Sequence, residues 1–170
     1  TGRRDSLVWT FNAIARASDN LRIRGLARRT DVEHGHSHGN QGTTEEPNPD
    51  GILPGSSHDS HTATMGLRWG NPALSLGVGL VRYRGGYGVP FHHHADDTGE
   101  PTVEIDDVRL ALKQDRLEVR LDAAPASGWL HNLRARIGHT DYGHVERERG
   151  IAETTFAVKT TEARVEGRGG

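Results

Sequence analysis

Apolar and polar residues alternate along most of the chain, as in β-strands that have one face in apolar surroundings. In residues 6–17 the apolar positions include Leu7 and Trp9, with polar or mixed residues between them. The same alternation runs through residues 61–70 and 73–84. No comparable face with a 3.6-residue period is found. The sequence therefore predicts an all-β, antiparallel fold.

Turn residues and the alternation together predict about seven strands. Apolar parity changes inside residues 104–124, between Leu112 and Leu117. A tight turn near 114–116 would give eight strands and permit a small closed barrel, whereas one long strand crossing a bulge keeps the number at seven. The single strand is favoured because it preserves an alternation of short and long connections. The expected strands are residues 5–17, 20–33, 61–70, 73–84, 104–124, 130–142 and 154–166.

The lengths of the connections indicate an up-and-down transmembrane β-barrel. Short turns at 18–20 and 70–72 alternate with long polar segments at 34–61 and 85–103. With a single strand before it, a polar loop at 143–153 falls on the side of the long segments. Outer-membrane barrels have short periplasmic turns, long extracellular loops and an even number of strands from 8 upwards. Seven strands therefore predict a segment of a larger barrel, with the whole chain as one partial domain.

Composition excludes several other classes of function. The net charge of −2 gives no reason to expect a nucleic-acid partner. The absence of cysteine excludes disulfide frameworks and thiolate zinc sites. No apolar run reaches the roughly 20 residues of a membrane helix. No phosphate loop, HExxH helix or nucleophile elbow is present, so an enzyme is not expected.

Histidine carries the candidate chemistry, since the chain has 11 histidines and most of them cluster in the two long polar segments. Imidazole suits zinc, copper, nickel and iron, and carboxylates can fill the remaining coordination positions. The alternative is a polar loop in which histidine serves only as a soluble residue. The candidate metal ligands are His34, His36, His38, His58, Asp59, His61, His92, His93, His94, Asp96 and Asp97.

A smaller group of titratable residues lies at the end of the sixth expected strand. It consists of His139, Asp141 and His144. For this group a hydrogen bond within the loop is favoured over metal ligation.

Four stretches of the chain resemble one family of membrane proteins. They are Tyr87-Gly88-Val89-Pro90-Phe91-His92-His93-His94, the pair Arg28-Arg29-Thr30-Asp31 and Gly51-Ile52-Leu53-Pro54 that bounds a loop, residues 108–120, and residues 133–146. Together they resemble TonB-dependent outer-membrane receptors of the zinc-uptake type, which carry histidine-rich extracellular loops. His139 departs from the pattern, because the family has an aromatic residue at that position.

The resemblance implies a barrel of about 22 strands with an N-terminal plug domain, located in the outer membrane of a Gram-negative bacterium. Such a receptor is energised by the TonB complex of the inner membrane. No plug and no TonB box are recognised in this chain, so it is expected to form about a third of such a barrel, in contact with outer-membrane lipid. The ligand would be a divalent metal, with Zn²⁺ as transported ligand rather than catalytic cofactor. Arg22, Arg24, Arg68 and Arg120 are expected to line the polar interior.

Two other functions stay open on the sequence alone. One is a TonB-dependent receptor for a siderophore or another metal chelate, on which the histidines merely decorate the loops. The other is a soluble β-sandwich that sequesters metal.

Overall fold

The computed structural model describes residues 6–27, 49–90, 94–95, 101–102, 108–125 and 128–170. All regular structure in these residues is β-strand, which confirms the all-β prediction. The strands are β1 Ser6–Ser18, β2 Leu21–Leu26, β3 Asp50–Leu53, β4 His58–Gly70, β5 Leu74–Gly88, β6 His94–Ala95, β7 Pro101–Thr102, β8 Val108–Ala123, β9 Leu130–Glu148 and β10 Ile151–Gly169.

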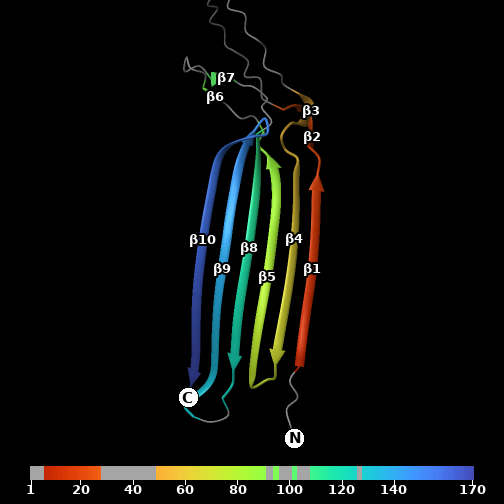
Figure 1. Cartoon of the computed structure of the whole chain (residues 1–170). Helices are drawn as coiled ribbons and strands as arrows, with labels where there is room; N and C mark the ends of the chain where they lie inside the picture. Colours follow the sequence, from red (N-terminus) through yellow and green to blue (C-terminus); the bar gives the residue numbers. More distant parts are fainter. Residues whose placement is uncertain (1–5, 28–48, 91–93, 96–100, 103–107, 126–127) are drawn as a thin grey trace, which may run out of the picture.

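Six strands form one antiparallel main sheet in the order β1-β4-β5-β8-β9-β10. Each strand pairs with the next main-sheet strand along the chain, so the topology is an up-and-down meander (Figure 1). β2 with β3 and β6 with β7 form two small sheets near one end of the main sheet (Figure 1). The main sheet is open, because β1 and β10 do not pair with each other in the described part of the chain.

The expected strand over 20–33 is wrong as a member of the main sheet. Its described part is the shorter β2, which pairs with β3. Gly25 has φ 79°, and the β2–β3 register shifts between Arg22 and Leu26, so the alternating pattern does not extend into a long regular strand here. The main sheet therefore has six strands rather than seven.

The polar segments differ from the expectation. Because β2 lies outside the main sheet, the connection between β1 and β4 covers residues 19–57. The turn expected at 18–20 therefore lies at the end of the sheet where the long segments attach, and not at the opposite end. β3 lies within the first of these segments, and β4 begins already at His58, which pairs with Ser18 on one side and Tyr87 on the other. β5 likewise continues to Gly88. Polar side chains do not end these strands, because the neighbouring strands satisfy their backbone groups.

β8 confirms the single long strand and corrects the expected bulge. Its pairing with β5 and with β9 runs without a register shift. Leu110 and Leu112 therefore lie on one face of the sheet, and Leu117 and Val119 lie on the other. The parity of the apolar residues changes because the two faces exchange character partway along the sheet.

The expected loop over 143–153 is wrong. β9 runs to Glu148 and β10 begins at Ile151. The connecting Arg149 and Gly150 have φ values of 48° and 84°. Two central residues with positive φ are typical of a type I′ hairpin turn, which matches the twist of paired strands. The turn does lie at the end of the sheet where the long segments attach, as expected (Figure 1).

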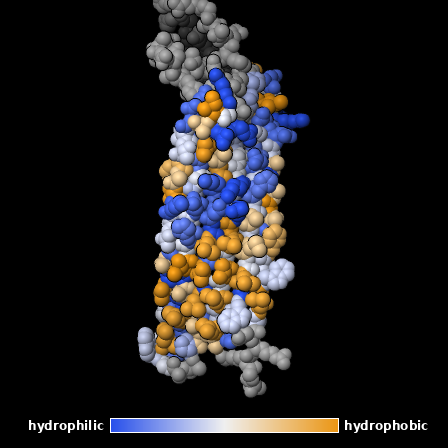
Figure 2. All heavy atoms as spheres, viewed as in Figure 1, coloured by the Kyte–Doolittle hydropathy of each residue, from blue (hydrophilic) through white to orange (hydrophobic). Residues whose placement is uncertain are grey.

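The main sheet has an apolar face and a polar face, because residues directly opposite each other in an antiparallel ladder share a face. In one half of the sheet, apolar side chains occupy the same face on neighbouring strands. Figure 2 shows them gathered in the half nearer the C-terminus. We call this surface the apolar belt; its rows are Leu7–Trp69–Leu76–Leu121–Ala135–Val165, Trp9–Leu67–Val78–Val119–Ile137–Ala163 and Phe11–Met65–Leu80–Leu117.

Charged residues bound the apolar belt towards the end where the long segments attach. Arg82 and Arg84 both pair with Asp115, at N–O distances of 2.9 and 2.8 Å. One strand further, Lys159 lies 3.3 Å from Asp141. On this face, the row of residues next to the apolar belt therefore already consists largely of paired charges.

The described residues form a single layer without a conventional core. Among them, Val108 is the one large apolar side chain that is buried, at 2% exposure. Trp9 and Phe11 in the apolar belt are 73% and 61% exposed. A sheet normally covers its apolar face with a second layer. In the part of the chain that the structure describes, nothing covers the belt.

The turn between β4 and β5 depends on Gly70. Its φ is 135°, and a Cβ there would lie 2.2 Å from the carbonyl oxygen of Leu74 and 2.6 Å from the Cα of Ser75. We expect Gly70→Ala to destabilise the sheet by about 1–3 kcal/mol. Gly79→Ala is the control, because a Cβ there has no neighbour within 4 Å. Urea unfolding of the detergent-refolded chain measures both, and equal midpoints would contradict the prediction.

Candidate functional site

Three predicted metal ligands, His58, Asp59 and His61, lie in β4 instead of a loop. Alternation along the strand puts Asp59 and His61 on the apolar face and His58 on the polar face. The Ser18 Oγ and the His58 Nδ1 are hydrogen bonded at 3.0 Å. Asp59 lies 3.6 Å from a guanidinium nitrogen of Arg109. The structure therefore separates His58 from Asp59 and His61, and gives His58 and Asp59 other partners.

Most of the other predicted ligands lie outside the described residues: His34, His36, His38, His92, His93, Asp96 and Asp97. His94 begins β6, where the structure describes the backbone and not the side chain. Within the described ranges, no group of three or more histidine and carboxylate side chains is placed to hold a metal ion. Metal binding by the two segments stays a prediction.

The topology joins both histidine-rich segments to the same end of the sheet. The first segment enters β4, and the second leaves β5, the adjacent strand (Figure 1). One backbone hydrogen bond ties these attachment points together, because the Gly88 N–H donates to the Ser57 carbonyl at 3.1 Å. A second joins the two ends of the second segment, where the Val89 N–H donates to the Val108 carbonyl at 2.9 Å.

The group His139, Asp141 and His144 lies inside β9 and is divided between its two faces. The His139 Nδ1 is 2.8 Å from the Thr161 Oγ1 on β10. His144 stacks on Phe156 with ring centroids 5.2 Å apart. The expected hydrogen bond within a loop is therefore wrong. Asp141 pairs with Lys159 instead of a histidine, and the His144 Nδ1 is 3.3 Å from the Tyr142 hydroxyl within β9.

Arginine dominates part of the polar face. The strand register aligns Arg68 on β4, Gly77 on β5, Arg120 on β8, Arg136 on β9 and Arg164 on β10. We call Arg68, Arg120, Arg136 and Arg164 the arginine row. Arg68 and Arg120 thus lie on the polar face, as expected.

Two other arginines expected there are elsewhere, because Arg22 and Arg24 belong to β2 and so lie outside the main sheet. Arg136 and Arg164 were not among the arginines expected on this face. Strand alternation alone could have assigned them to a polar face, but their alignment with Arg120 depends on the register.

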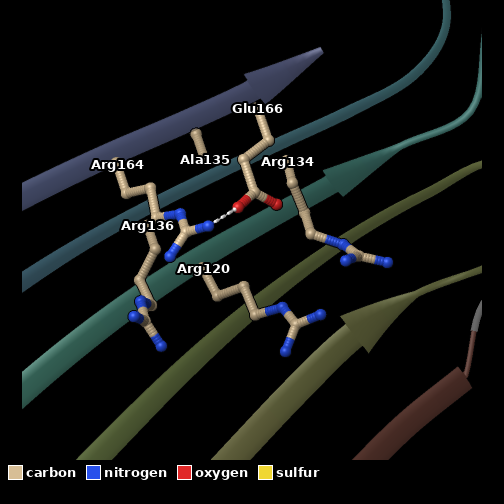
Figure 3. A pocket seen from close by; sticks show the side chains of 6 residues that line it. All are labelled: Arg120, Arg134, Ala135, Arg136, Arg164 and Glu166. Carbon is tan, nitrogen blue, oxygen red and sulfur yellow. Dashed lines mark ion pairs between the residues drawn. The ribbon is translucent and has the colours of Figure 1, made fainter. Parts of the chain in front are cut away.

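Carboxylates partly neutralise the arginine row. Asp122 accepts hydrogen bonds from Arg120 at 2.9 and 3.1 Å and from Arg134 at 3.1 Å. Arg164 pairs with Glu166 (Figure 3). Arg136 lies 3.9 Å from Glu118, beyond hydrogen-bond distance.

Arg68 has a neutral partner. Its guanidinium donates two hydrogen bonds to the Ser75 Oγ, at 2.8 and 3.2 Å. Among the described residues, Arg68 therefore has no carboxylate partner, and Arg136 has only the ion pair of 3.9 Å with Glu118, without a hydrogen bond to it.

The surface is hollowed over the arginine row. One hollow of about 190 Å³ is lined by Arg120, Arg134, Ala135, Arg136, Arg164 and Glu166, the residues drawn in Figure 3. A second, of about 310 Å³, is lined by Arg68, Gly77, Arg120, Asp122, Asn132 and Arg134. The two hollows share Arg120 and Arg134. This arrangement presents guanidinium donors to solvent on the polar face.

Among the described residues no helix is long and apolar enough to cross a membrane. No protein-family profile and no curated protein sequence matches the chain.

Proposed function

We propose that this chain forms part of the wall of an outer-membrane β-barrel, in a TonB-dependent receptor of the zinc-uptake type. The observation that carries the proposal is the two-faced single layer of the main sheet. One face carries the apolar belt, and the opposite face carries polar residues and the arginine row. Such alternation, apolar towards lipid and polar towards the lumen, is typical of transmembrane β-barrels.

Energetics support lipid as the cover of the apolar belt. Removing one large apolar side chain from water is worth about 1.5–3 kcal/mol. Trp9, Phe11 and their neighbours in the belt together therefore favour a strongly apolar environment. Acyl chains supply that environment without any second protein layer. The paired charges at Arg82, Arg84 and Asp115 are suited to the hydrated headgroup region.

The two open edges support continuation of the sheet. β1 and β10 are long strands, and unpaired long edges invite association with other chains. Closure with further strands removes both edges, and single-chain bacterial barrels have at least 8 strands. We therefore propose that the six strands pair with additional strands in a larger barrel.

A metal ligand is supported by where the histidines attach. Eight of the chain's histidines lie within or beside the two segments at one end of the sheet. They are His34, His36, His38, His58, His61, His92, His93 and His94. We propose that this end faces outside and captures a divalent metal, Zn²⁺. His58 and His61 lie at the base of the segments on opposite faces of β4, so they would act as separate ligands.

The soluble sandwich is a weaker alternative. A sandwich requires a second sheet packed on the apolar belt. The two small sheets of β2–β3 and β6–β7 lie beyond the end of the main sheet instead (Figure 1).

The pH dependence of Zn²⁺ binding tests capture by histidine. Imidazole must be neutral to ligate a metal, and its ordinary pKa is about 6.5. We expect saturable binding to the detergent-refolded chain at pH 7.5, and binding weakened by about tenfold or more at pH 5. Ca²⁺, which prefers oxygen ligands, is the control and should not show this loss. Equal Zn²⁺ affinity at both pH values would contradict ligation by imidazole.

A further inference from the structure

We propose that the polar face carries a binding site for a small, multiply charged oxyanion at the arginine row. The first observation is the register itself. Arg120, Arg136 and Arg164 lie directly opposite one another on three neighbouring strands. The Cβ atoms of such partners are about 4.5–5.5 Å apart, and like charges at this spacing destabilise a sheet. The three adjacent arginines therefore destabilise the sheet when no ligand is bound. A bound anion would neutralise their charge and remove this cost.

The second observation is that the neighbouring carboxylates leave an excess of positive charge. The arginine row and the rows on either side of it hold four carboxylates, Glu118, Asp122, Glu162 and Glu166. Arg116 takes part of this charge, since it pairs with both Glu118 and Glu162. The three rows hold five arginines, and Arg116 in the next row raises the number to six against the four carboxylates. The six are Arg68, Arg116, Arg120, Arg134, Arg136 and Arg164.

The excess falls on the arginines that border the hollows. Arg68 is held by the hydroxyl of Ser75, and Arg136 is 3.9 Å from its nearest carboxylate oxygen. A neutral hydroxyl partner orients the guanidinium without cancelling its charge, and a distant carboxylate cancels that charge only in part. Both arginines can therefore still pair with an incoming anion.

The third observation is the open floor between Arg68 and Arg120. Gly77 occupies the row between them, and a Cβ there would make only ordinary contacts, at 3.8 Å or more. At Gly79, one row along, a Cβ would have no neighbour within 4 Å. Packing within the sheet therefore does not require glycine at these two positions. The lack of a side chain at Gly77 keeps the hollow of about 310 Å³ open above the strands. Both glycines also line a neighbouring hollow of about 310 Å³, together with Arg68 and Arg120.

The donors define the class of ligand. Guanidinium presents a planar fork that matches the two oxygens of a carboxylate or phosphate group. Arg120 and Arg134 are oriented by their shared Asp122, so part of the donor set is fixed before a ligand arrives. The size of the hollows suits a small molecule with two or more acidic groups, such as a polycarboxylate or a polyphosphate. This inference does not rest on metal capture and survives if Zn²⁺ does not bind.

The test is isothermal titration of citrate and of pyrophosphate into the detergent-refolded chain, in metal-free buffer with an uncharged detergent. We expect saturable binding that weakens as salt is added, because exposed charges are screened. Stronger binding of citrate would identify a carboxylate ligand, and stronger binding of pyrophosphate a phosphate ligand. Absence of saturable binding for both anions would overturn the proposal.

Two double variants make the test specific to the arginine row. Arg68→Gln with Arg136→Gln removes the two arginines that form no hydrogen bond to a carboxylate among the described residues, and should weaken binding by about tenfold or more. Arg82→Gln with Arg84→Gln removes the same charge from the opposite face and should leave the affinity within about twofold. Equal affinities of the two variants would overturn the site.

Unfolding distinguishes a binding role from a structural one. Removing like charge from the row should leave the urea midpoint of the Arg68→Gln, Arg136→Gln variant unchanged or raised in the absence of anion. A lowered midpoint combined with unchanged anion affinity would show that the row stabilises the sheet and does not bind a ligand.

Discussion

Replacing His92, His93 and His94 with alanine is expected to weaken Zn²⁺ binding by the chain by about tenfold or more. Loss of a mere hydrogen-bonding partner of a metal ligand already costs about 10–100-fold in affinity, so loss of ligands should cost at least as much. The segment holds three adjacent imidazoles followed by Asp96 and Asp97. It leaves the sheet beside the strand that the other histidine-rich segment enters. Isothermal titration of Zn²⁺ into the refolded chain measures the effect.

A matched variant removes three histidines from elsewhere in the chain. His131, His139 and His144 all lie in β9, outside the two segments. The structure gives His139 and His144 partners within the sheet, Thr161 and Phe156. Their joint replacement by alanine should leave Zn²⁺ affinity within about twofold, since no metal-holding group of side chains is found among the described residues. If both triple variants lose the same affinity, capture by the segment is wrong and any binding depends on the number of histidines alone.

Strand alternation predicted much of the fold because the assignment of apolar and polar residues to opposite faces of a strand is a local property of the sequence. Leu7, Trp9 and Leu67 occupy positions of one parity, and the register brings them onto one face. The long β8 was also predictable, since the alternation of connections required it. The bulge expected in this strand was wrong. That prediction assumed that one face stays apolar along the whole strand, whereas Leu112 and Leu117 lie on opposite faces.

The errors at the strand ends have a common physical cause. Polar residues such as His58 and Glu146 resemble loop residues in a linear sequence. In the sheet their backbones pair with neighbouring strands, so polar side chains do not end the strand. For β2 the error was the reverse, because the strand was predicted to be longer than it is. Its alternation predicted a long strand, but Gly25 and the irregular pairing with β3 confine it to a short one.

The candidate sites also differ in how far the sequence alone can predict them. Clustering of histidine is visible in the sequence, but His58 and His61 are three residues apart in one strand and therefore point to opposite faces. The arginine row is the converse case. Arg120, Arg136 and Arg164 are far apart or unremarkable in the sequence, and only the register aligns them. A site made from one residue per strand cannot be read before the pairing is known.

Val119→Arg is expected to destabilise the chain in lipid by about 2–4 kcal/mol, the cost of arginine on the lipid-facing side near the bilayer midplane. Val119 lies in the middle row of the apolar belt, directly opposite Val78 and Ile137. The matched control is Gln114→Arg on the same strand. Gln114 faces the polar side between Tyr83 and Tyr142, where an added cation stays in water. Urea unfolding of the chain in lipid vesicles measures both variants.

Contact with acyl chains has a direct optical signature that separates lipid from a protein cover over the apolar belt. Trp9 and Trp69 lie within the belt and are 73% and 51% exposed, so brominated acyl chains should quench their fluorescence when the chain is in vesicles. A second protein layer over the belt would also make Val119→Arg costly, but it would shield both indoles from the bromine atoms. Destabilisation together with quenching is therefore the result expected of a barrel wall. Equal stability of Val119→Arg and Gln114→Arg in vesicles would show that the apolar belt does not face lipid.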